Sequence, residues 1–139
     1  MSKYFVAYVA ALLSILLMEA LWLGTLMAGY YRSQLGFLLL EQPKAIPAVV
    51  FYLLYPLGVV IFVVAPALAV RSRARAALLG ALFGLFAYMT YDLSNLSTIK
   101  GWPVGVTLVD LGWGVLLTCV SGTVGYLAGG YWSNRSARV

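Results

Sequence analysis

Three acidic side chains lie inside apolar stretches of this 139-residue chain: Glu19, Asp92 and Asp110. A carboxylate in such surroundings is costly, and it usually faces the interior of a helix bundle or a wet cavity. Three carboxylates in a low dielectric cannot all stay ionised without compensation, so at least one is protonated or neutralised by a cation. A group of this kind suits proton transfer, binding of an ammonium-like ligand or coordination of a hard cation.

Each of these acids has a polar or aromatic neighbour three residues on, which lies on the same face if the segment is helical. Tyr88, one turn before Asp92, and Thr107, one turn before Asp110, extend two of these faces. We therefore expect a pocket with polar and aromatic walls. The predicted ligand-binding or proton-binding residues are Glu19, Asp92, Asp110, Asn95, Trp22, Trp113 and Tyr88.

Structural interpretations of the same acids stay open. Asp92 is interfacial if its helix ends in the polar stretch 94–98, and Asp110 has Lys100 or Arg32 as possible ion-pair partners. Glu19 alone can hold helices together through a shared hydrogen bond. Trp22 and Trp113 are more often packing residues than ligand contacts.

The composition predicts a membrane protein. The chain is 63% hydrophobic with a mean hydropathy of +0.96, and only 9% of its residues are charged, against about 25% in soluble domains. It has no histidine, and Cys119 is its single cysteine. We therefore expect no cofactor and no metal site, and the serine and cysteine residues form no activated nucleophile.

Four apolar runs are long enough to cross a bilayer as helices, and they cover residues 4–28, 46–70, 76–98 and 103–130. Short connections favour antiparallel neighbours, so the predicted fold is an all-α, up-down four-helix bundle in one transmembrane domain, residues 1–139. Residues 29–45 are expected to form a loop, with Tyr30 and Tyr31 as anchors at the membrane surface.

Basic residues predict the orientation. Of the nine, six lie at the termini and in the second connection, at residues 71–75, and three lie in the other connections. This bias places both termini in the cytoplasm and the three intramembrane acids in the outer half of the bilayer. Because the basic residues flank apolar runs, the net charge of +5 indicates topology, and no nucleic-acid partner is expected.

Small residues and prolines predict details of the helix packing. The pairs Gly80/Gly84 and Gly125/Gly129 have the GxxxG spacing that lets membrane helices approach closely. Pro56 and Pro66 are expected to bend the second span.

Several segments resemble the small predicted bacterial membrane proteins of domain-of-unknown-function family 2177. They are "MEALWLG" (18–24), "FYLLYPLG" (51–58), "APAL" (65–68), "GALFGLFAYMTYDLSNLSTIKGWP" (80–103) and "DLGWG" (110–114). The resemblance implies a four-helix, multi-pass protein of the bacterial inner (cytoplasmic) membrane. It implies no activity, substrate or catalytic residue.

Three functions are compatible with these residues. The best supported is binding or transport of a cationic or lipid-like small molecule through the carboxylate and aromatic pocket, with Glu19 as the main protonatable site. The alternative is a structural or accessory subunit, in a homo-oligomer or a larger membrane complex. A lipid-modifying enzyme with Asp92 and Asp110 as acid and base is less supported, since a carboxylate pair without a metal or cofactor motif is weak evidence.

Overall fold

The computed structural model describes residues 2–136, and they are helical apart from short connections. Four helical stretches are long and apolar enough to span a membrane, as predicted. Two of them are made of more than one element. The elements are α1 (Lys3–Leu21), η1 (Trp22–Leu26), α2 (Ala28–Leu35), α3 (Ala45–Val59), η2 (Val60–Val64), α4 (Ala65–Ala69), α5 (Arg73–Thr98) and α6 (Val104–Ser136), where η marks a π-helical turn. The third and fourth spans, α5 and α6, are each one continuous helix.

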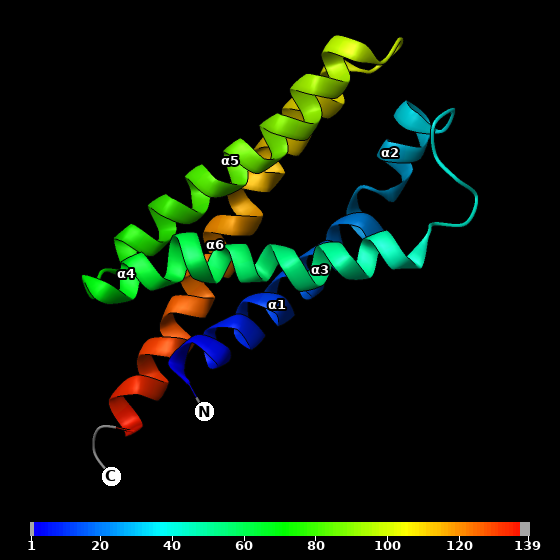
Figure 1. The fold of residues 1–139 in the computed structure, drawn as a ribbon. Helices are drawn as coiled ribbons and strands as arrows, with labels where there is room; N and C mark the ends of the chain where they lie inside the picture. Colours follow the sequence, from blue (N-terminus) through cyan, green and yellow to red (C-terminus); the bar gives the residue numbers. More distant parts are fainter. Residues whose placement is uncertain (1, 137–139) are drawn as a thin grey trace.

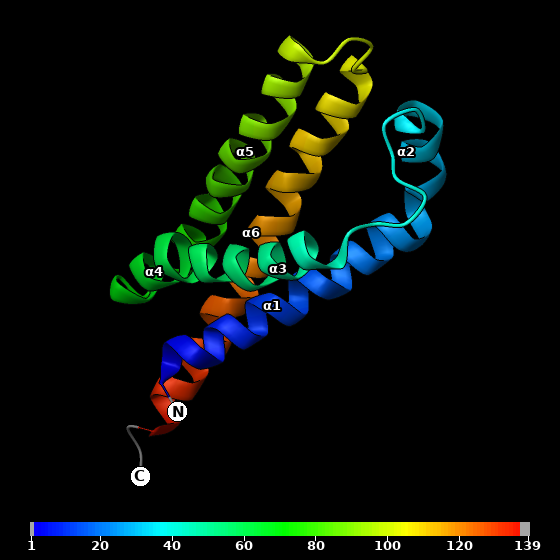
Figure 2. The same cartoon turned by 45° about the vertical axis from the view of Figure 1, so that its right-hand side comes forward.

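The helices follow the expected up-down order (Figures 1 and 2). Helix α6 packs against α5 along one part of its length and against α1 along another. The second span, α3 to α4, crosses the others obliquely. The start of α1, the end of α6 and the α4–α5 turn lie at one end of the molecule, and α2 and the α5–α6 turn lie at the other. Which end faces the cytoplasm stays a prediction from the basic residues.

Glycines set the close approach of the helices, and the structure identifies the partner of each predicted pair. A Cβ atom on Gly84 would lie 1.9 Å from the carbonyl oxygen of Gly114, so α5 and α6 touch through their backbones. Gly129 of the second pair packs on α1, where a Cβ would lie 2.9 Å from the carbonyl oxygen of Lys3. Larger residues at these positions would push the helices apart.

The second span contains Pro56 and Pro66, and its backbone hydrogen-bond pattern widens between them. Pro56 lies inside α3, and η2 follows it. At the end of η2, the N–H of Ala65 donates to the carbonyl of Val60, five residues back. Because Pro66 has no N–H and its ring would clash with the carbonyl four residues back, a wider turn fits this position.

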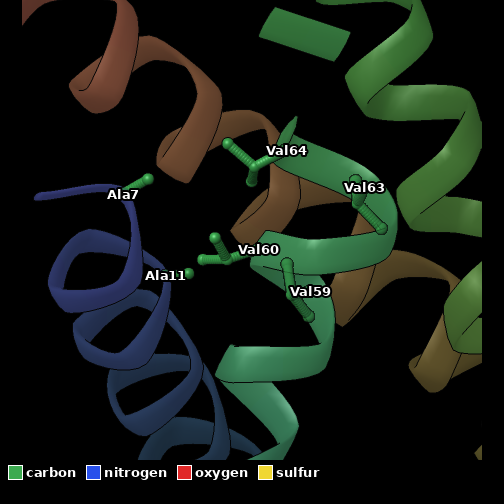
Figure 3. Close-up of a cluster of buried hydrophobic side chains, with 6 residues drawn as sticks. All are labelled: Ala7, Ala11, Val59, Val60, Val63 and Val64. Atoms are coloured by element: carbon green, nitrogen blue, oxygen red, sulfur yellow. The ribbon is translucent and has the colours of Figure 1, made fainter. Parts of the chain in front are cut away.

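A cluster of small and β-branched side chains closes the bundle between α1 and the second span (Figure 3). All six members are buried, and none carries a polar side-chain atom. We call this group the valine cluster: Ala7, Ala11, Val59, Val60, Val63 and Val64.

The first connection differs from the prediction. Residues 29–45 were expected to be a loop, but residues 28–35 form helix α2. The chain passes from α1 into η1, where the N–H of Met27 donates to the carbonyl of Trp22 at 2.8 Å, and then into α2. After this π-helical turn, the side chain of Tyr31 on α2 contacts Asp110 on α6.

Candidate functional site

A cavity of about 460 Å³ lies at the end of the bundle that carries α2. It collects side chains from α1, η1, α2, α5 and α6, together with the loop after α2. Its size is within the range of small-molecule pockets. The lining residues are Glu19, Trp22, Leu23, Ala28, Tyr31, Arg32, Leu35, Leu39, Pro43, Tyr88, Tyr91, Asp110 and Trp113. Five of the predicted site residues are in this set: Glu19, Trp22, Tyr88, Asp110 and Trp113.

Glu19 lies near the end of α1 and is only 7% exposed. The indole N–H of Trp113 donates to its Oε1 atom at 3.0 Å, and the hydroxyl of Tyr88 donates to the same atom at 3.2 Å. Within residues 2–136, Oε2 has no hydrogen-bond partner. Two donors on one oxygen favour a charged carboxylate, while burial disfavours it. Oε2 remains available to a ligand.

Two tryptophans form one wall of the cavity. The rings of Trp22 and Trp113 are stacked, with centroids 4.1 Å apart and planes 4° apart. Trp22 comes from η1 and Trp113 from α6. The stack therefore fixes the end of the first span against α6, and it holds the Trp113 N–H toward Glu19.

Tyr31 connects this wall to Asp110. The indole N–H of Trp22 donates to the Tyr31 hydroxyl at 3.1 Å, and that hydroxyl donates to Oδ1 of Asp110. Burial raises the pKa of the Tyr31 phenol, and the hydrogen bond to Asp110 raises it further, so the hydroxyl stays protonated. The sequence placed Tyr31 at the membrane surface, but the unpredicted turn η1 and helix α2 bring it into the site.

Asp92 lies on α5 and its side chain is fully buried, at 0% exposure. Helix α5 ends at Thr98, inside the polar stretch 94–98, so the interpretation of Asp92 as an interfacial residue stays a prediction. Neither of its carboxyl oxygens has a hydrogen-bond partner within residues 2–136. The carboxyl group of Asp110 interacts electrostatically with the carboxyl group of Asp92. Asp110 lines the cavity, and Asp92 lies outside its lining.

Asn95 and Thr107 lie outside the cavity lining. The side chain of Asn95 interacts with the side chain of Tyr91, which does line the cavity. Thr107 accepts a hydrogen bond from the indole N–H of Trp102 at 3.1 Å. This contact joins the segment before α6 to the first turn of that helix.

More acidic than basic side chains line the cavity. Arg32 lines it from α2, whereas Lys100 does not. In the part of the chain that the structure describes, no Lys or Arg pairs with Glu19, Asp92 or Asp110. Glu19 and Asp110 therefore receive neutral donors, Asp92 interacts with the carboxyl group of Asp110, and Arg32 also lines the cavity. Within residues 2–136 no three Asp, Glu or Cys side chains are grouped as a metal site.

Comparison with known proteins gives one finding. A family model described as Predicted membrane protein (DUF2177) matches residues 4–127. Searches of curated proteins and of solved structures returned no match. The family match agrees with the resemblance seen in the sequence, and its description assigns no activity.

Proposed function

This multi-pass membrane protein belongs to the DUF2177 family, and we propose that it binds an organic cation in the cavity, with Glu19 as the counter-charge. One observation carries this proposal. Glu19 is buried and faces the cavity, and among residues 2–136 only the neutral side chains of Trp113 and Tyr88 donate to it, so a negative charge there would have no cationic partner. A buried carboxylate is stabilised most by an opposite charge at close range.

The walls of the cavity suit a cation with an apolar body. Trp22, Trp113, Tyr88 and Tyr91 present aromatic rings to it, and most of the remaining lining is aliphatic. Aromatic faces attract cations, most strongly where water is excluded. A lipophilic ammonium or phosphonium compound meets both conditions, because it combines one charge with a large apolar surface.

The surroundings of the protein fit such a ligand. We infer from the basic residues that both termini face the cytoplasm, which puts the cavity in the outer half of the membrane. The family resemblance favours the bacterial inner membrane. A lipophilic cation partitions into the outer leaflet there, and it would reach Glu19 from that side.

The proposal is tested by binding of tetraphenylphosphonium to the purified protein, measured by calorimetry and by tryptophan fluorescence. Glu19→Gln should weaken binding at least about 30-fold, equivalent to about 2 kcal/mol, because it removes the buried charge but keeps the side-chain shape. Glu41→Gln is the matched control, since Glu41 is exposed in the loop after α2. Triphenylphosphine oxide, a neutral molecule of similar shape, should bind weakly to all three proteins.

Two results would overturn the proposal: equal affinity of the wild type and Glu19→Gln for tetraphenylphosphonium, or equal affinity for the neutral molecule. Absence of binding together with low abundance of Glu19→Gln would instead favour the accessory-subunit alternative. The enzyme alternative has less support, because Asp92 does not line the cavity and so is not placed to exchange a proton with a substrate there.

A further inference from the structure

The carboxyl group of Asp92 has surroundings that need an explanation. It is fully buried among membrane-spanning helices, and within residues 2–136 neither oxygen accepts or donates a hydrogen bond. Such a group usually has a partner, and an orphaned one points to a bound species or a chemical role. The carboxyl group of Asp110 interacts electrostatically with it.

Two carboxylates side by side in a dry interior repel each other strongly. One proton between them removes one charge and supplies the hydrogen bond that Asp92 lacks. Tyr31 donates to Oδ1 of Asp110 and so helps to hold the remaining charge. The other titratable groups around the pair are Glu19 on α1 and Tyr88 and Tyr91 on α5, none of which supplies a positive charge. Arg32 on α2 lines the same cavity as Asp110 but forms no ion pair with it among residues 2–136.

The pair is connected to the cavity on one side only. Asp110 lines the cavity, and Asp92 does not. Asp110 and Glu19 act on each other electrostatically. A cation seated at Glu19 would therefore also stabilise a negative charge on Asp110, while Asp92 stays sealed from the ligand.

From this geometry we propose that Asp92 and Asp110 form a proton-binding pair that releases its proton when a cation enters the cavity. The inference rests on the proposed cation binding at Glu19 and adds proton exchange to it. One cation enters and one proton leaves through Asp110 into the cavity, so the charge of the site is unchanged. The proton site is therefore this pair, whereas the sequence alone favoured Glu19.

The test is calorimetric titration with tetraphenylphosphonium at one pH in two buffers of different ionisation enthalpy. The wild type should release about one proton per bound cation. Its affinity should rise about tenfold per pH unit over the range in which the pair holds the proton, because a released proton favours binding at higher pH. Infrared difference spectra should show the loss of a protonated-carboxyl band on binding.

Asp92→Asn is the informative variant. Its amide can donate permanently to Asp110, so the variant should bind the cation but release no proton from the pair, and the infrared band should not change. Proton release by Asp92→Asn equal to that of the wild type would overturn the inference and place the proton on Glu19. Wild-type binding without proton release, or binding that follows sodium concentration instead of pH, would also overturn it.

These outcomes are separable from failure of the proposed function. If the wild type binds no cation, the proposed function fails. If it binds the cation without releasing a proton, only the exchange fails. The wild-type measurement keeps the inference falsifiable even if Asp92→Asn does not fold.

Discussion

The two halves of helix α6 bury different surfaces. Before Gly114 its buried residues are Val106, Thr107, Asp110 and Trp113, which are mostly polar or large. From Gly114 onward most of them are small: Gly114, Leu117, Thr118, Ser121, Gly122, Gly125 and Gly129. The second half packs by backbone contact on α1 and beside the valine cluster, whereas the first half adjoins the cavity.

This difference shows how one helix can support both a fixed scaffold and an open site. Where glycines face a neighbour, helices meet closely and leave no room for a ligand. Where tryptophan and aspartate face inward, their side chains find partners on other helices. The stacked indoles of Trp22 and Trp113 join the first span to α6. Changes in the second half should therefore affect the fold, and changes in the first half should affect binding.

The largest effect is expected from Gly84→Ala. The new Cβ would lie 1.9 Å from the Gly114 carbonyl, and backbone atoms cannot move aside cheaply. The variant should lose about 3 kcal/mol or more of stability, or fail to accumulate. The measurement is thermal unfolding in detergent, followed by size-exclusion chromatography. Gly112→Ala is the control on α6, because its Cβ would meet no atom within 4 Å; equal stability of the two variants would contradict the backbone contact.

Trp113→Phe should have a smaller effect, and mainly on binding. Phenylalanine keeps much of the ring but cannot donate to Glu19, so affinity for tetraphenylphosphonium should fall about fivefold, or about 1 kcal/mol. The control is Trp102→Phe, which removes a similar indole hydrogen bond, to Thr107, outside the cavity. If both variants weaken binding equally, Trp113 acts through general stability and not through Glu19.

Tyr31→Phe is expected to have the smallest effect. It removes the hydroxyl between Trp22 and Asp110, which should loosen α2 and lower the affinity about threefold. Trypsin should then cleave faster after Arg32, an exposed residue of the same helix. Tyr30→Phe is the neighbouring control and should be cleaved at the wild-type rate. Unchanged cleavage in Tyr31→Phe would mean that the hydroxyl does not fix α2.

Most of the fold was predictable from the sequence, because bilayer thickness imposes long apolar runs and short turns impose antiparallel order. Both glycine pairs were identified, but their partners were not, since GxxxG spacing does not name the facing helix. The π-helical turn η1 and helix α2 were missed. Nothing in the local pattern of residues 22–35 distinguishes a helix that contacts α6 from a loop that leaves the membrane.

The site was predictable only in part, for the same reason. Glu19, Asp110 and the two tryptophans were found because intramembrane acids and helical spacing are local signals. Tyr31 was not, since its contact with Asp110 joins residues 79 apart in the chain. Asn95 has the right spacing from Asp92 but lies outside the cavity lining. Spacing therefore predicts which residues share a face, while tertiary contacts decide which face meets the cavity.

The most direct measurement is a structure of the protein with tetraphenylarsonium, whose arsenic atom can be located by anomalous scattering. We predict an arsenic peak inside the cavity, between the Glu19 carboxylate and the aromatic rings, and its loss in Glu19→Gln. An arsenic peak only on the outer surface of the bundle, or one that persists unchanged in Glu19→Gln, would contradict the assignment of Glu19 as the counter-charge.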